Sequence, residues 1–395
     1  MDEFQEVEEI GLGSNLKNAA SGVVVGLAMF FGAFPLLWWN EGRAVDTARM
    51  LTEAKGGVVS IDAAADPSSH EGQLVHLQGD LQIDEEVVDS TFDVRVKRPG
   101  LMRQVEMYQW KQKVKTKEEK KVGGGTRKIK TYSYTKTWSK EAISSGSFKR
   151  PEGHENPSMP FGSWSGRAKA GKLGAFTVDS AVLSEVDARE PLKLEDEFMA
   201  KLKERVGGRE VALQGEGNTA YVGSADSPQI GDLRIGYYQL KSDVSVIAEP
   251  TSGLLQAKTM SNGERLLIVA AGQKNAQEMI EWEETKNTFM TWLIRLGGFL
   301  LMFFGVKSML SIVVTLANIL PFLGGFAEFG TSLIATVIAA PCALITIALA
   351  WIVYRPIIGV SLLVVGVVIA VALIVKGKRD NMVTLPDGTQ VELPG

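Results

Sequence analysis

Long runs of apolar residues are concentrated in the last third of the chain and recur once near its beginning. Thr331–Tyr354 and Ile357–Val375 each contain close to the ~20 apolar residues that a helix needs to cross a hydrocarbon layer of ~30 Å. A third run extends from about Phe289 to Met309, and a fourth lies at Gly22–Trp39. The four runs predict four transmembrane helices, with one large polar insert between the first and the second in chain order.

These runs divide the chain into predicted parts. They are a polar tail (residues 1–18), a first transmembrane helix (19–39), a polar domain (40–285), a second transmembrane helix (286–310), an interfacial helix and loop (311–330), a third (331–354) and a fourth (357–375) transmembrane helix, and a second polar tail (376–395). The interfacial helix is predicted because the apolar run Ile312–Leu320 is too short to span. An alternative division makes Leu296–Leu320 the second span and places Lys307 near its middle.

Small residues within the spans suggest close helix packing. We interpret the first span as a retained signal anchor, because an acidic segment precedes it and the aromatic stretch Phe34–Trp39 is a poor cleavage site. In this span Gly22 and Gly26 form a GxxxG pattern, which either specifies helix pairing or merely allows it. The third span carries a second stripe of small residues: Ala335, Ala339 and Ala343.

The polar insert shows the alternation that is typical of strands. Val105–Lys115 and Thr126–Trp138 alternate on either side of a triple glycine, which predicts a long hairpin whose loop needs positive φ angles. Between positions 111 and 136 the hairpin carries ten Lys or Arg against two acidic residues. This basic hairpin either reaches anionic lipid headgroups or is an exposed sheet edge protected by lysines.

Three further segments complete the prediction for the insert. Phe148–Gly174 is rich in Gly, Pro and Ser and predicts a long ordered loop. Leu192–Val206 shows a helical pattern, and residues 276–310 predict one helix that begins above the bilayer and continues into it.

Two basic residues in the second span are candidate functional charges. Arg295 and Lys307 are ~18 Å apart along one helix at ~1.5 Å per residue. Because this separation is shorter than a bilayer core, both side chains can reach opposite interfaces, and the alternative is that they line a pore.

Composition and motifs argue against several kinds of chemistry. The formal net charge of −4 gives no reason to expect a nucleic-acid partner, and the single Cys342 excludes an intramolecular disulfide. The three histidines lack metal-ligand spacing, and the sequence holds no phosphate-binding loop or nucleophile elbow, so we predict no metal and no cofactor. His154 and Glu155 form the best candidate acid/base pair, although a loop histidine is more often structural.

Local motifs along the chain resemble those of the transmembrane-protein-43 family, also called LUMA. The motifs are Asn40-Glu41-Gly42-Arg43-Ala44, Glu71-Gly72-Gln73-Leu74-Val75-His76, Val105-Glu106-Met107-Tyr108-Gln109-Trp110, Tyr132-Ser133-Tyr134 with Trp138, Gly153-His154-Glu155-Asn156-Pro157-Ser158, Gly231-Asp232-Leu233-Arg234, and Tyr354-Arg355-Pro356. The resemblance implies an α+β membrane protein with four transmembrane helices, cytoplasmic tails at 1–18 and 376–395, and a β-rich extracytoplasmic domain at 40–285. It also implies the endoplasmic reticulum and inner nuclear membrane in a eukaryote, or the inner membrane, with a periplasmic domain, in a bacterium.

We therefore predict a non-enzymatic, multi-pass membrane protein that organises or scaffolds membrane protein complexes through its large domain. Its expected partners are the lipid bilayer and membrane proteins, with homo-oligomerisation as an option. Two alternatives stay open. One is an oligomeric ion channel or channel modulator, and the other is an enzyme that acts on lipid or envelope material.

Overall fold

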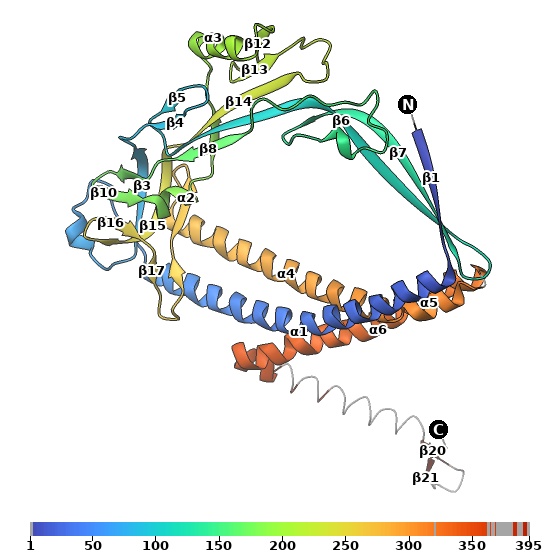
Figure 1. Ribbon diagram of the computed structural model, residues 1–395. Coiled ribbons are helices and arrows are strands. Elements are labelled where there is room, and N and C mark those ends of the chain that lie inside the picture. The colour runs from blue at the N-terminus through green and yellow to red at the C-terminus, as the bar shows by residue number, and fades with distance from the viewer. Residues whose placement is uncertain are drawn as a thin grey trace. The chain divides into compact units, whose positions relative to one another are not determined.

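A computed structural model describes residues 3–319, 321–361, 364, 368, 382–384 and 390–392. The chain divides into two compact units (Figure 1). We call the first the sheet unit; it contains residues 3–10, 49–120 and 126–286. We call the second the helical unit; it contains residues 11–48, 121–125 and the described residues from 287 onward.

The helices include three long apolar ones. The α-helices of the described residues are α1 Leu12–Gly57, α2 Ser180–Glu185, α3 Asp196–Arg205, α4 Ala276–Met309, α5 Ser311–Ala317 and α6 Pro321–Tyr354. Short 3₁₀ turns lie at Pro67–His70 and Ser145–Ser147. By length and composition, α1, α4 and the Phe326–Tyr354 part of α6 can each cross a membrane. The predicted fourth span, 357–375, lies largely outside the described residues.

The long helices differ from the sequence prediction at their ends. α4 confirms the single helix predicted for 276–310, but α1 continues without a break from Leu12 to Gly57 through the predicted end of the first span. α5 lies in the segment where a short helix was predicted. α6 begins at Pro321, although a loop was predicted up to residue 330. Proline is compatible with a first helical turn, and membrane helices tolerate glycine, so Gly324-Gly325 does not end the helix.

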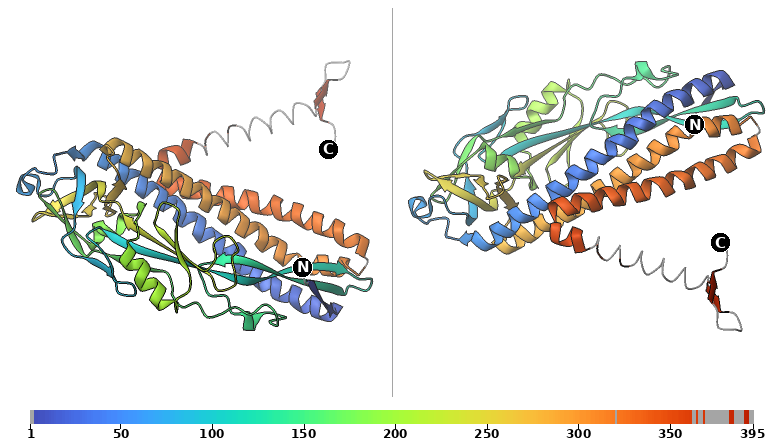
Figure 2. Two further views of the ribbon diagram at one scale, coloured as in Figure 1. Left: turned by 90° about the horizontal axis from the view of Figure 1, so that it is seen from above. Right: turned by 90° about the horizontal axis from the view of Figure 1, so that it is seen from below.

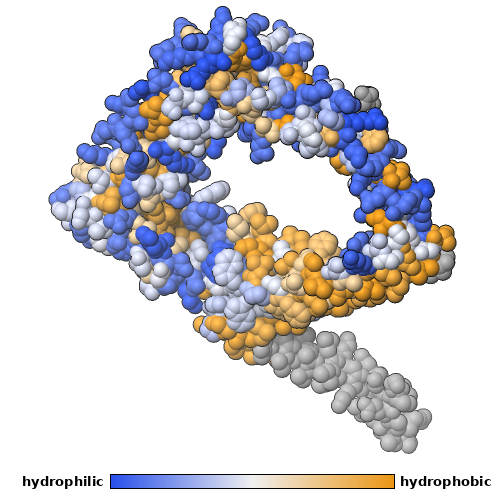
Figure 3. Space-filling model, in the orientation of Figure 1, coloured by the Kyte–Doolittle hydropathy of each residue, from blue (hydrophilic) through white to orange (hydrophobic). Residues whose placement is uncertain are grey.

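Hydrophobic side chains cover the outside of the helical unit. Figure 3 shows them gathered over its helices, and large side chains such as Phe31, Phe289 and Val337 are mostly exposed. Contiguous exposed apolar surface of this kind needs a nonaqueous environment. The helical unit is therefore built to be surrounded by lipid.

Within the helical unit, α1, α4 and α6 run side by side (Figure 2). Their common core includes Ala33 and Leu37 of α1, Met302 of α4, and Ala339 and Ala343 of α6. α1 and α4 are antiparallel, because the start of α1 lies against the end of α4 at Ser308.

The sheet unit contains two main sheets. The strands are β1 Glu3–Ile10, β2 Val59–Ser60, β3 Val75–Gln82, β4 Val87–Asp89, β5 Val94–Val96, β6 Gly100–Lys120, β7 Thr126–Ser139, β8 Trp164–Arg167, β9 Ala170–Leu173, β10 Phe176–Asp179, β11 Arg189–Pro191, β12 Val211–Gln214, β13 Thr219–Val222, β14 Leu233–Leu240, β15 Asp243–Thr251, β16 Leu254–Gln256, β17 Lys258–Thr259, β18 Arg265–Leu266 and β19 Ile268–Ala271; two more, β20 Met382–Thr384 and β21 Gln390–Glu392, pair with each other near the C-terminus.

The larger sheet has the order β1-β7-β6-β14-β13-β12, with β8 on β6 and β11 on β14. In the other sheet β15, β16, β10, β9 and β3 pair in turn, and β3 pairs again with β15, so these five strands close into a small barrel. Alternate residues of β6, such as Leu101, Val105 and Met107, point into the core, where they meet Ile235 and Tyr237 of β14.

The predicted hairpin is confirmed. Residues 107–120 of β6 pair in register with residues 126–139 of β7. Gly123 and Gly124 in the connecting loop have φ angles of 88° and 78°, a conformation that costs a glycine little.

Two predicted irregular segments contain strands. The second half of Phe148–Gly174, predicted as a loop, forms β8 and β9, because each finds a partner strand, β6 and β3, far away in the sequence. Leu192–Val206, predicted as one helix, is helical only from Asp196 to Arg205.

The N-terminal residues form a strand instead of a free tail. All eight residues of β1 pair antiparallel with β7. The cytoplasmic location that the family resemblance implies for residues 1–18 stays a prediction.

Candidate functional site in the helical unit

A buried ion pair joins the three long helices. Arg295 of α4 donates to Glu41 of α1 through both Nε and Nη2, each at 2.7 Å from a carboxylate oxygen. The indole Nε1 of Trp351, on α6, donates to Glu41 Oε2 at 2.7 Å. The Glu41 side chain is only 1% exposed and that of Arg295 14%. One carboxylate thus contacts both of the other helices.

Aromatic rings surround the guanidinium group of Arg295. Its carbon lies 4.8 Å from the centroid of Trp292 and 5.5 Å from that of Trp351. Cation–π contacts of this kind are strongest where the cation is shielded from water. The rings therefore stabilise the charge and restrict the orientation of the side chain.

A second polar network lies beside the ion pair. Arg43 Nη1 donates to Asn287 Oδ1 at 3.0 Å, and its Nη2 donates to Thr291 Oγ1 at 3.0 Å and to Asn40 Oδ1 at 3.3 Å. Asn40 Nδ2 donates to the backbone oxygen of Thr291 at 3.2 Å. Three of these four hydrogen bonds connect α1 to α4.

Helical periodicity explains this arrangement. Asn287, Thr291 and Arg295 are spaced by four residues, so they lie on one face of α4. On α1, Asn40 and Arg43 are three apart and face the same neighbour. The Asn-Glu-Gly-Arg-Ala motif is therefore a helix surface that matches a polar stripe on α4.

The glycine of this motif is required by packing. A Cβ at Gly42 would lie 2.8 Å from the ring of Tyr354 on α6. Tyr354 also packs edge-on against Trp38, with ring centroids 6.1 Å apart. Gly42 thus lets α6 approach α1 beside the ion pair.

The predicted GxxxG residues lie against α4. A Cβ at Gly26 would be 2.5 Å from the backbone oxygen of Gly305. At Gly22 it would be 3.2 Å from Ser308 Oγ, and Ser308 donates to the Gly22 carbonyl at 2.7 Å. Both glycines therefore sit where two helix backbones come close together.

The predicted stripe on α6 is buried. Ala335, Ala339 and Ala343 are at most 4% exposed, and the last two pack in the core with Leu37 and Met302. The structure thus buries this stripe of α6 in the core that it shares with α1 and α4.

The two predicted candidate charges have different surroundings. Arg295 belongs to the buried ion pair, whereas Lys307 lies 3.7 Å from Glu328 of α6 in a partly exposed pair. Arg295 and Lys307 therefore belong to two separate ion pairs. Sequence reasoning named Arg295 but missed its partner Glu41.

A signal for Glu41 was present in the sequence. Glu41 and Arg295 are opposite charges within or at the end of apolar runs, and charges in such places nearly always have partners. Pairing these two residues would have predicted which helices are in contact.

The candidate acid/base pair in the sheet unit is held by packing. The His154 ring is stacked on Tyr134 at a centroid distance of 3.9 Å and meets Trp110 edge-on at 4.8 Å. Its Nδ1 donates to the backbone oxygen of Arg150 at 3.2 Å. The backbone N–H of Glu155 itself and that of Gly153, which donates to the carboxylate at 3.0 Å, lower the pKa of the Glu155 carboxyl. Both residues thus stabilise their loop.

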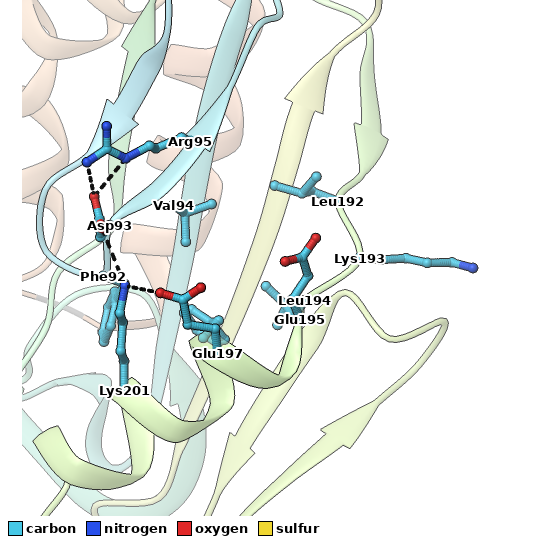
Figure 4. A pocket seen from close by; sticks show the side chains of 11 residues that line it. Phe92, Asp93, Val94, Arg95, Leu192, Lys193, Leu194, Glu195, Glu197 and Lys201 are labelled. Carbon is cyan, nitrogen blue, oxygen red and sulfur yellow. Dashed lines mark hydrogen bonds and ion pairs between the residues drawn. The ribbon is translucent and has the colours of Figure 1, made fainter.

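A pocket of about 290 Å³ in the sheet unit is lined by Phe92 and by charged side chains (Figure 4). Asp93 pairs with Arg95 at 2.8 Å and with Lys201 at 3.4 Å, and Lys201 also pairs with Glu197 at 2.8 Å. These charges neutralise one another, so the pocket does not present a poised acid or base. Among the described residues, no three His, Cys, Asp or Glu side chains gather in a way that could hold a metal ion.

Comparison with known proteins identifies relatives. A family model described as Transmembrane protein 43 matches residues 107–356. Transmembrane protein 43 of Rattus norvegicus is 32% identical over 362 residues, which cover 88% of each chain. The Homo sapiens protein is 32% identical over 384 residues, covering 93% of this chain and 92% of the human one. The Transmembrane protein 43 homolog of Drosophila melanogaster is 29% identical over 354 residues, covering 86% of this chain and 91% of the fly protein.

No solved structure matches this chain. The family model covers more than half of the sequence, and the relatives align over most of their own length. The motif at residues 40–44, which builds the ion pair, lies upstream of the region that the family model matches. This chain belongs to the transmembrane protein 43 family, and both this membership and its apolar helices make it an integral, multi-pass membrane protein.

Proposed function

We propose that this protein is a non-enzymatic organiser of membrane protein complexes, in which the helical unit is a fixed anchor and the sheet unit holds partners. The observation that carries this proposal is the bond of one buried carboxylate, Glu41, to both Arg295 and Trp351. A polar contact shared by three helices is costly to separate in an apolar environment. It suits an anchor that keeps one shape.

The same observation weighs against the channel alternative. A conducting path needs polar groups that face a water-filled lumen. Arg295, one of the two candidate charges, is paired with Glu41 within the helix contacts. Lys307, the other candidate, is paired with Glu328.

The sheet unit offers the surface for partners. Its long hairpin exposes basic side chains on β6, including Lys111, Lys113 and Lys115. Exposed basic residues on an extended element can select acidic partners through charge complementarity. We also propose that residues 357–375 form a fourth span, on the basis of their composition.

The proposal is tested with the full-length protein in its native membranes. After chemical crosslinking in situ, we expect the purified protein to retain a defined companion in a constant ratio. A multi-pass protein of similar abundance in the same membranes serves as the control. Recovery of the same companions with the control protein, or of none, would contradict the proposal.

A flux measurement separates the organiser from the channel. Purified protein is reconstituted into liposomes beside a Lys307→Ala variant at equal density. We expect both preparations to pass ions no faster than empty liposomes. Flux from the wild type that the variant alters would establish the channel alternative.

A further inference from the structure

Two cavities adjoin on the sheet unit beside α3. The first, of about 290 Å³, lies between β5 and the segment Leu192–Glu195 (Figure 4). The second, of about 570 Å³, is lined by the turn after β4 and by the C-terminal half of α3. Phe92, Asp93 and Lys201 line both cavities, so the two form one groove, which we call the α3 groove. Its size is in the range of sites that bind ligands.

The floor of the α3 groove is apolar. Phe92, Leu194 and Phe198 are at most 8% exposed, and the rings of Phe92 and Phe198 meet edge-on with their centroids 5.4 Å apart. An apolar group that enters a cavity lined in this way is removed from water, which is favourable. The floor therefore suits an apolar side chain of a partner.

The two ends of the α3 groove carry opposite charges. Asp93 and Lys201, at its centre, pair with each other at 3.4 Å. The Glu195 carboxylate is directed into the first cavity and bonds to no other described side chain (Figure 4). At the other end the guanidinium carbon of Arg205 lies 5.8 Å from the ring centroid of Phe92, and Arg205 forms no ion pair with the described residues. The groove thus has a negative end and a positive end.

One wall of the first cavity is a stretch of extended backbone. The N–H groups of Leu192 and Leu194 donate to the carbonyls of Tyr237 and Gly217. Successive N–H and C=O groups of an extended chain point in opposite directions, so those of Lys193 point away from these partners. The Lys193 side chain also points away from the cavity (Figure 4), so its backbone forms the wall. A free strand edge of this kind suits a peptide.

We propose that the α3 groove binds a short extended peptide segment with a basic side chain at one end, an apolar one in the middle and an acidic one at the other end. Glu195 and Arg205 are ten positions apart, or ~15 Å along the helix. Side chains i, i+2 and i+4 of an extended peptide share one face and span ~13 Å. The basic side chain reaches Glu195, the apolar one the floor, and the acidic one Arg205.

This inference rests on the proposed function, since it names the part of the sheet unit where a partner is held. The test uses full-length protein in lipid nanodiscs and the fluorescent peptide Lys-Thr-Leu-Thr-Glu with blocked ends. We expect saturable binding, and Arg205→Glu should raise the Kd about fivefold or more, because repulsion replaces an exposed ion pair. The same variant should bind Lys-Thr-Leu-Thr-Lys more tightly than the wild type does. Lack of binding of the first peptide to the wild type at low salt would overturn the proposal.

Two matched controls separate docking from general charge attraction. Lys203→Glu makes the same charge change at an exposed position of α3 that lines neither cavity, and should leave the Kd unchanged. The peptide Lys-Thr-Ser-Thr-Glu should bind more weakly than the leucine peptide, because it leaves the apolar floor unfilled. Equal weakening by Lys203→Glu, or equal binding of the serine peptide, would contradict the proposed groove.

The crosslinking purification separates the groove from the organiser. We expect Arg205→Glu to recover less of the companion than the wild type, and Lys203→Glu to recover as much. Failure of the purification in the wild type, with the peptide still bound, would refute only the organiser. Full recovery of the companion by Arg205→Glu would show that the α3 groove does not hold the partner, and the organiser would stand.

Discussion

Two buried arginine–carboxylate pairs, one in each unit, can be compared. In the sheet unit Arg103 of β6 lies 2.5 Å from Asp89 of β4, and Tyr237 donates to the same carboxylate oxygen at 2.5 Å. In the helical unit Arg295 and Trp351 donate to Glu41. Each carboxylate therefore receives one arginine and one aromatic donor.

The pairs differ in what else supports them. Asp89 also accepts from the backbone N–H of Thr91 at 3.0 Å, and Arg103 Nε donates to the Gly162 carbonyl at 3.0 Å. Burial and the bond to Asp89 raise the pKa of Tyr237, so its phenol stays a donor. Glu41, by contrast, receives its bonds from side chains of other helices.

This difference follows from the backbone. In a helix the N–H and C=O groups bond to one another along the chain, so they cannot serve a buried carboxylate. Strand ends and turns leave such groups free to bond. The sheet pair therefore fixes a local loop, whereas the helical pair determines which helices pack together.

The largest effect is expected from breaking the helical pair. Glu41→Gln or Arg295→Leu alone leaves a buried polar partner unmatched and should lower the free energy of unfolding by about 3–5 kcal/mol. The double variant Glu41→Leu, Arg295→Leu should be close to wild type, since apolar replacements leave no charge behind. Unfolding in bicelles measures all three. A double variant as unstable as the singles would contradict this account.

Breaking the sheet pair should cost less. Asp89→Asn keeps the turn contact with Thr91 and leaves Arg103 bonded to Gly162, so we expect a loss of about 2 kcal/mol. Denaturant titration, followed by tryptophan fluorescence, measures the loss. A cost equal to that of Glu41→Gln would show that the backbone contacts do not compensate.

Close packing gives the next effect. Gly26→Ala places a methyl group against the Gly305 backbone and should destabilise by about 1–3 kcal/mol. Gly32→Ala is the matched control, because a Cβ there meets nothing within 4 Å, and the higher helix propensity of alanine should stabilise by up to ~1 kcal/mol. Equal effects at both positions would exclude a packing role for Gly26.

The two aromatic donors sharpen the comparison further. Trp351→Phe removes one of the side-chain bonds to Glu41 and should cost about 1–2 kcal/mol, while Tyr237→Phe should cost about 1 kcal/mol, because Asp89 keeps its backbone donor. Measuring the free energy of unfolding of both variants under the same conditions shows which substitution costs more. The reverse order would count against the backbone explanation.

The smallest effect concerns pH and the sheet unit alone. Burial lowers the pKa of His76 below its usual 6.5, while its Nε2 donates to the Lys274 carbonyl at 2.8 Å. The pKa of His76 is therefore higher in the unfolded state than in the folded state, so the unfolded state takes up the proton first as the pH falls. The contribution of neutral His76 to the free energy of unfolding is fully present above pH 6.5 and declines as the pH falls from there through the lowered pKa. His76→Gln should flatten this decline in unfolding curves recorded between pH 7.5 and 5. An unchanged slope would assign it to other groups.

Much of the fold was predictable because it depends on local patterns. Apolar runs located three long helices, and alternation with a glycine loop located the hairpin of β6 and β7. The strands β8 and β9 were missed, since four-residue segments show little periodicity and gain stability only from distant partners. In the candidate site, Arg295 and Gly26 were named in advance, whereas Glu41 and Trp351 were not.

The sequence by itself determined that this protein enters a membrane and carries a large β-rich insert, because composition and period act within a few turns of chain. Only the tertiary structure decided that Glu41 meets Arg295, 254 positions away, and Trp351, 310 positions away. It also decided that an acidic leading segment pairs with a basic hairpin. Such contacts depend on how helices rotate against one another and on which sheet edge is free, and neither is encoded in the local pattern around any of these residues.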